Sequence, residues 1–217
     1  MFIQTQAVPL VLVEDAITLK ADVQLYIKRE DLIHPLISGN KWRKLKYNLI
    51  TAKNLGKECL LTFGGAFSNH IYSLAAAAKE FDFQSIGIIR GEEHLPLNPT
   101  LQFASQQGMQ LEYISRTLYR QKNNVDFLEK LKEQFADFYL IPEGGTNDLA
   151  VKGCEEIVEE INIDFDYITC AVGTGGTIAG IIKGLNNEKN VIGFPALKGG
   201  DFLKNEIIDL IGETYQN

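Results

Sequence analysis

The sequence contains little cysteine, only Cys59, Cys154 and Cys170, which are well separated in a chain of 217 residues. An odd number of cysteines with no CxxC pair and no Cys/His cluster argues against a disulfide framework and against a structural zinc site. The sequence therefore predicts reduced and mostly buried thiols in a cytoplasmic protein, and no bound metal.

The chain also lacks an excess of positive charge and any long apolar run. Its 28 acidic residues outnumber the 21 basic ones, and the resulting charge of -7 argues against a nucleic-acid partner. No apolar run approaches the roughly 20 residues that a membrane span requires. No basic leader precedes an apolar core near the N-terminus, so we expect no signal peptide and no membrane association.

What the chain does contain is an alternation of short, β-branched apolar runs with stretches of helical period. This alternation predicts an α/β fold with mostly parallel strands. Helices are expected at the alanine-rich run Ser73–Lys79 and at two apolar stripes, Phe127/Leu128/Leu131/Phe135 and Cys154/Ile157/Val158/Ile161. The expected strands are Val23–Lys28, Cys59–Phe63, Gln84–Ile89, Leu111–Ile114, Phe138–Ile141, Tyr167–Val172 and Val191–Phe194.

The first candidate site is the segment Ser38–Leu45. Ser38 or Asn40 can cap a helix, and Lys41 then falls in its first turn. The positive end of the helix dipole disfavours an extra cation there, which lowers the pKa of an amine and makes it a better nucleophile toward an aldehyde. By itself, a lysine at such a place is far more often a surface residue. The side chains expected to face the core are Trp42, Leu45 and Leu49.

The second candidate site is Leu61–His70, which has the pattern of a strand, a glycine turn and a helix N-terminus. A hydroxyl at Ser68, an amide at Asn69 and the local backbone donors around His70 together form a receptor for a carboxylate or a phenolate. The alternative is a capped helix in which Ser68 or Asn69 satisfies only its own backbone. Nothing in this segment requires a metal.

The third candidate site is Tyr167–Thr177, where a strand leads through glycines onto a helix expected from about Ile178. Such a loop is a phosphate cradle. A dinucleotide fingerprint would need Gly or Ala at position 178, and a P-loop would need a lysine after the glycines, so the spacing favours a monophosphate over both. A tight structural turn is the alternative. The residues that would hold the phosphate are Gly173, Thr174, Gly175, Gly176 and Thr177.

A fourth glycine-containing segment, Pro142–Asn147, is interpreted as a turn before a helix capped by Thr146 or Asn147, with no function required.

Four segments, taken together and in order, resemble the 1-aminocyclopropane-1-carboxylate deaminase / D-cysteine desulfhydrase family. They are Lys28–Leu32 (KREDL), Gly39–Leu45 (GNKWRKL), Ser68–His70 (SNH) and Val172–Thr177 (VGTGGT). That family belongs to the tryptophan-synthase-β-like enzymes that use pyridoxal 5′-phosphate (PLP). Each motif alone is common, but four in order are specific, and the resemblance covers nearly the whole chain.

The resemblance implies how the cofactor would be held. Lys41 would carry PLP and move protons, and Asn69 would donate a hydrogen bond to its phenolic oxygen. Gly173–Thr177 would bind the phosphate, with Lys44 lending a charge one helical turn from Lys41.

The resemblance also implies a reaction and an architecture. Ser68, with the amides around Asn69 and His70, would receive the carboxylate of a small amino acid, such as aminocyclopropane-carboxylate or D-cysteine. The products would be a 2-oxo acid and ammonia, with sulfide from cysteine. The implied fold is a three-layer, type II PLP fold with two α/β lobes, residues 1–51 plus 151–217 and residues 52–150, in a homodimer. Family members continue further past Gly199–Leu203.

Two other interpretations remain open on the sequence. The chain could bind PLP without turnover, as a catalytically impaired fragment. It could instead be a doubly wound nucleotide-binding module in which Lys41 is incidental, although the mismatch at Ile178 counts against that.

Overall fold

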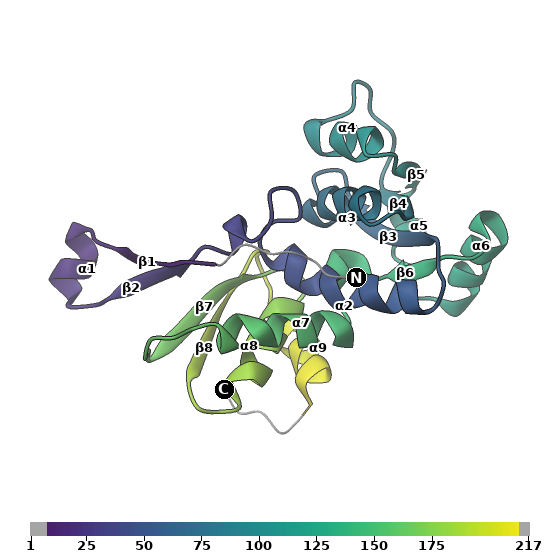
Figure 1. Ribbon diagram of the computed structural model, residues 1–217. Helices are drawn as coiled ribbons and strands as arrows, with labels where there is room; N and C mark the ends of the chain where they lie inside the picture. The colour runs from purple at the N-terminus through teal and green to yellow at the C-terminus, as the bar shows by residue number, and fades with distance from the viewer. Residues whose placement is uncertain (1–7, 213–217) are drawn as a thin grey trace.

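The computed structural model describes residues 8–212, and in this range the strands form three separate sheets. Figure 1 shows an N-terminal hairpin that projects from the body, a four-stranded sheet with its helices, and a two-stranded sheet with its own helices. The predicted α/β fold with mostly parallel strands is confirmed, because only the hairpin pairs antiparallel.

The four-stranded sheet has the order β5-β4-β3-β6 and is parallel throughout. Helices α3 and α4 pack on one face, and α5 and α6 pack on the other, so this part of the chain has three layers. Such burial on both faces explains the nearly continuous apolar runs of its strands. The elements are β3 Cys59–Gly65, α3 Asn69–Glu80, β4 Gln84–Arg90, α4 Pro99–Gln106, β5 Gln110–Ile114, α5 Arg116–Tyr119, α6 Val125–Phe135 and β6 Tyr139–Ile141.

The two-stranded sheet pairs β7 (Tyr167–Val172) with β8 (Asn190–Pro195) in parallel. One of its faces packs on α7 (Asp148–Glu159) and α8 (Gly176–Leu185), and α9 (Phe202–Ile211) packs against α8. The other face leaves Tyr167 and Phe194 each 59% exposed.

Helix α2 (Asn40–Asn54) joins these two parts of the molecule, as its position in Figure 1 shows. Trp42, Leu45 and Leu49 are buried in the core that α2 shares with α3, as predicted. Another side of α2 packs on α7. The two helices approach so closely at Gly153 that a Cβ there would lie 2.0 Å from the carbonyl oxygen of Arg43. Glycine is therefore required at this crossing.

The N-terminal hairpin is the part that the sequence predicted least well. It consists of β1 (Leu10–Val13), α1 (Ala16–Ala21) and β2 (Leu25–Lys28), and only the last was expected. The strand predicted from Val23 begins two residues later, because Asp22 has a left-handed conformation (φ 52°) that ends α1. Two 3₁₀ turns, Glu30–Leu32 and Glu143–Gly145, complete the elements of the described range.

Several local predictions can be compared with the structure. The cap of α2 is Gly39, with no side-chain hydrogen bond, so the prediction of Ser38 or Asn40 was wrong. Helix α8 begins two residues before Ile178, and Ile161 lies beyond the end of α7. Asn147 caps α7, and the three cysteines are unpaired, as predicted. Among residues 8–212, none of the helices has the length and apolar character that a membrane crossing requires.

Candidate functional site

The topology of the four-stranded sheet places a switch point beside β3. Strands β4 and β5 extend the sheet to one side of β3 and β6 lies on its other side, so the order of the strands reverses between β3 and β6. In open α/β sheets, ligands bind beyond the carboxyl ends of the strands at such a switch point. The loop before Ser68 leaves β3 there, and the turn Glu143–Gly145 leaves β6 there.

Two lysines from the first turns of α2 reach this turn. The Nζ atoms of Lys41 and Lys44 lie 3.4 Å and 3.1 Å from the carbonyl oxygen of Gly144. Lys44, only 2% exposed, also donates to the hydroxyl oxygens of Thr146 (2.9 Å) and Thr174 (3.2 Å). Burial lowers the pKa of both lysines, and the charge of Lys41 lowers that of Lys44 further. Lys41 therefore lies where the sequence predicted, in the first turn of a helix.

No carboxylate pairs with either of these lysines within the described range. The thiols that face them, Cys154 and Cys170, are neutral, because burial raises the pKa of each to about 11. The pair is thus a buried positive charge in need of an anion, since an unpaired charge is costly to bury.

The glycine loop between β7 and α8 lies beside this pair. Gly175, with φ 75°, precedes α8, and no side chain of the described residues caps this helix. The free amides and the helix dipole favour an anion. Gly176 leaves room for the lysine, because a Cβ there would lie 3.1 Å from Lys44 Nζ.

A cavity of about 120 Å³ opens between the two lysines and the glycine loop. Its donors, two amines and uncapped helix amides, suit a phosphate group, and its volume matches that end of a cofactor rather than a whole one. The Asn40 amide donates to the Thr177 hydroxyl (2.8 Å) at its edge. Of the residues predicted to bind the cofactor or its phosphate, Gly176 does not line this cavity; those that do are Lys41, Lys44, Gly173, Thr174, Gly175 and Thr177.

Ser68 and Asn69 lie at the N-terminus of α3, outside the lining of this cavity. The Ser68 Oγ accepts from the amides of His70 (3.2 Å) and Ile71 (3.3 Å), which is the capping interaction that the sequence left open as an alternative. The hydroxyl proton of Ser68 stays available to a carboxylate, since the cap uses only the oxygen lone pairs. Asn69 is exposed.

The ring of His70 links the two parts of the site. It is 1% exposed, and its Nε2 lies 2.9 Å from Thr62 Oγ1, whose own proton is donated to the Ile141 carbonyl (2.7 Å). Nε2 is therefore the protonated nitrogen, and Nδ1, which has no partner among the described residues, is an acceptor. Burial, with the charges of Lys41 and Lys44, keeps the pKa of His70 well below its usual value. The ring cannot donate to a carboxylate, and the backbone N–H of His70 already donates to Ser68 Oγ.

Three residues of the site were not predicted. Asn40, Gly144 and Thr146 contact the lysines or the glycine loop, although the sequence suggested only a cap or a turn for them. The sequence signal for the turn that contains Gly144 and Thr146 was the pair of adjacent glycines before Thr146. In the structure both glycines have positive φ.

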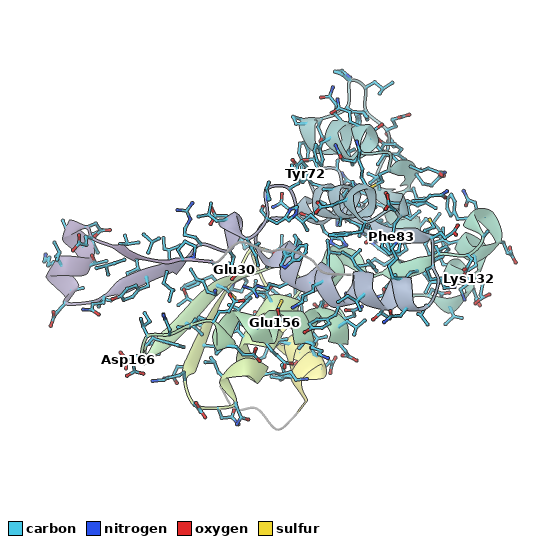
Figure 2. The ribbon with its side chains drawn as sticks, viewed as in Figure 1. Glu30, Tyr72, Phe83, Lys132, Glu156 and Asp166 are labelled. Atoms are coloured by element: carbon cyan, nitrogen blue, oxygen red, sulfur yellow. The ribbon has the colours of Figure 1, made fainter. Side chains whose placement is uncertain are left out.

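On another face of α2, Arg43 forms a second and fully paired cluster. Its guanidinium bonds to Glu30 (3.0 Å) and Glu160 (2.6 Å) and lies 3.5 Å from Glu156, while Lys28 also reaches Glu160 (2.8 Å). Figure 2 labels Glu30 and Glu156, which lie close to α2. This cluster fixes α2 to α7.

Comparison with known proteins gives a consistent result. A family model described as pyridoxal-phosphate dependent enzyme matches residues 5–201. A putative 1-aminocyclopropane-1-carboxylate deaminase of Pyrococcus horikoshii is 32% identical over 210 residues, which are 90% of this chain and 62% of that protein. A D-cysteine desulfhydrase of Serratia proteamaculans is 29% identical over 174 residues, 75% of this chain and 53% of the relative.

Among solved structures, an ACC deaminase homologue superimposes with a TM-score of 0.82 at 28% identity, covering 96% of this chain and 66% of the other. A fungal L-serine ammonia-lyase from Rhizomucor miehei, at 17% identity and a TM-score of 0.68, shares the fold. The chain spans about three fifths of the length of the Pyrococcus relative.

Proposed function

Because the chain belongs to the family of pyridoxal-phosphate dependent enzymes, we propose that it binds PLP and deaminates a small amino acid. Its fold is the type II fold of these enzymes, as the resemblance implied. The observation that carries the proposal is the pair of buried lysines beside an uncapped glycine loop, with no carboxylate to neutralise it within residues 8–212.

The residues of the cavity fit the cofactor. Lys41 would hold its aldehyde carbon, the loop Gly173–Thr177 and Lys44 its phosphate, and Asn69 its phenolic oxygen. When bound, PLP supplies the electron sink for the chemistry at the substrate's α-carbon.

The chain's own residues would transfer protons and orient the substrate. Lys41, whose pKa is lowered by burial, holds or moves a proton at Nζ. The Ser68 hydroxyl and the backbone amides around Asn69 and His70 would orient the substrate carboxylate.

The substrate class in this proposal is aminocyclopropane-carboxylate, D-cysteine or a similar small amino acid. The products are a 2-oxo acid and ammonia, with sulfide from cysteine. The names of the relatives support this choice. We also propose two lobes, residues 1–51 plus 151–217 and residues 52–150, which the separate hydrophobic cores of the two parallel sheets support. The proposal of a cytoplasmic homodimer rests on the family resemblance.

Reduction with borohydride tests the cofactor and Lys41 together. The full chain is mixed with PLP, reduced and mapped by peptide mass spectrometry. We expect a pyridoxyl group on Lys41, and none there in Lys41→Ala. Folded protein that gains no such group, or gains it on exposed lysines alone, would refute the proposal.

The alternative to this proposal is PLP binding without turnover. Release of 2-oxo acid from D-cysteine and from aminocyclopropane-carboxylate separates the two. Labelled Lys41 without any product supports binding alone.

A further inference from the structure

The two lysines of the site share one acceptor, but they are bonded unequally. Among residues 8–212, Lys44 Nζ has three oxygen acceptors at 2.9–3.2 Å, whereas Lys41 Nζ has only the Gly144 carbonyl oxygen, at 3.4 Å. An ammonium has three protons to donate, so the surroundings of Lys44 match an ammonium and those of Lys41 do not.

The groups packed around the pair leave it without a counter-ion. His70 from α3, Cys154 from α7 and Cys170 from β7 are all neutral, and the N-terminus of α8 adds partial positive charge. Two ammonium groups on one carbonyl therefore repel each other with little screening. Near neutral pH the pair holds one proton more easily than two.

Two effects compete over which lysine keeps that proton. Burial opposes a charge on Lys44, which is the more deeply buried of the two: desolvation and the neighbouring amine lower its pKa to about 7, while Lys41 is only half-buried. The hydrogen bonds act the other way, because bonds from a charged donor are stronger than those from a neutral one and Lys44 has two more of them.

We propose that Lys44 keeps the shared proton and, through the Gly144 carbonyl, keeps Lys41 in its neutral, nucleophilic form. A neighbouring cation is a known means of activating a lysine toward carbonyl compounds. The proposal deepens the function above, since it explains why Lys41 reacts, but the division of charge holds in the chain without a cofactor.

The test is the pH profile of methylation at individual lysines. The full chain, with no PLP added, reacts briefly with labelled formaldehyde and cyanoborohydride, and peptide mass spectrometry measures the initial rate at each lysine. Lys132, which is well exposed, is the internal reference. In Lys44→Gln, which is polar but neutral, we expect the Lys41 rate at pH 7 to fall about tenfold, the size of one pKa unit.

Two matched variants separate charge from shape. Lys44→Arg keeps a permanent cation and should keep the Lys41 profile within about twofold of the parent. Thr146→Val leaves both lysines and removes one acceptor of Lys44 at 2.9 Å, so the Lys41 rate should fall by a smaller factor as the proton shifts toward Lys41. Circular dichroism checks that each variant is folded.

The proposal is wrong if Lys41 reacts as fast in Lys44→Gln as in the parent chain. Lys44 is then neutral, or its charge does not affect Lys41. A faster reaction in Thr146→Val also contradicts it. These results are independent of the proposed function: a chain that never binds PLP still gives a methylation profile, and a chain that binds PLP can still fail this test.

Discussion

Two neighbouring residues of α2, Arg43 and Lys44, are buried cations that differ in their partners. Carboxylates neutralise the first but not the second. Arg43 is 2% exposed and bonds to the carboxylates of Glu30 and Glu160. Lys44, the next residue, is equally buried and bonds only to a carbonyl and two hydroxyls. Both charges carry a desolvation cost, but in the part of the chain that the structure describes only Arg43 is paired with carboxylates. The difference teaches that a buried cation with a structural role is neutralised by carboxylates of the protein. In a binding site, the position of the counter-ion is left for an anionic group of the ligand.

The largest expected effect comes from breaking the paired cluster. In Arg43→Met, Glu30 and Glu160 lose their main partner, and removing one member of a buried pair costs about 3–5 kcal/mol. We expect a loss near the lower end, since Glu160 is partly exposed, measured as the free energy of unfolding in urea. A variant as stable as the parent would mean that the cluster contributes nothing to the join between α2 and α7.

A smaller effect should appear on acidification. Although burial acts to raise it, the hydrogen bonds from Arg43 and Lys28 hold the pKa of Glu160 at about 2, below its ordinary 4.5. A depressed carboxyl pKa stabilises the fold above the unfolded value, and that stability is lost as pH falls from about 4.5 toward 2. We expect about 1 kcal/mol from this partly exposed group. Urea unfolding at pH 6 and pH 3 should show a shallower loss in Glu160→Gln, and equal losses would contradict the assignment.

The smallest effect should have the opposite sign. Lys44→Met removes a buried amine without a carboxylate, so we expect the ligand-free chain to gain about 1 kcal/mol, while stabilisation by inorganic phosphate is lost. The lysine pKa is lowered in the folded chain, so this cost is greatest at low pH and disappears as pH rises toward 10.5. Thermal melts with and without phosphate check both points. If Lys44→Met is less stable than the parent and is still stabilised by phosphate, Lys44 has a structural role like that of Arg43 and the prediction is wrong.

The sequence predicted most of the body of the fold, because apolar periodicity is a local signal. The strand Tyr167–Val172 was correct at both ends, and β3, β4 and β5 were correct to within two residues. The hairpin was harder, since four exposed or half-exposed residues of β1 bury too little to give a pattern. The same reason explains why α1 was missed.

The residues of the candidate site also differ in whether a local sequence pattern could predict them. Lys41 and the glycine loop have local signals, a helix start and a run of glycines. The partners of Lys44 do not, because Gly144 and Thr146 lie about a hundred residues away in the chain and only the fold brings them close. The orientation of the His70 ring likewise depends on Thr62 and on β6, which no spacing reveals.

Gly153 has a practical consequence for anyone who wishes to redesign this chain. Because no side chain fits between its backbone and that of Arg43, α2 and α7 cannot be separated by even one methyl group without moving both helices. Since Lys41 and Lys44 are on one of these helices and Glu156 is on the other, a library that varies the pocket should hold position 153 constant. Mutational tolerance along α7 should accordingly be lowest at this residue, although glycine has no side chain.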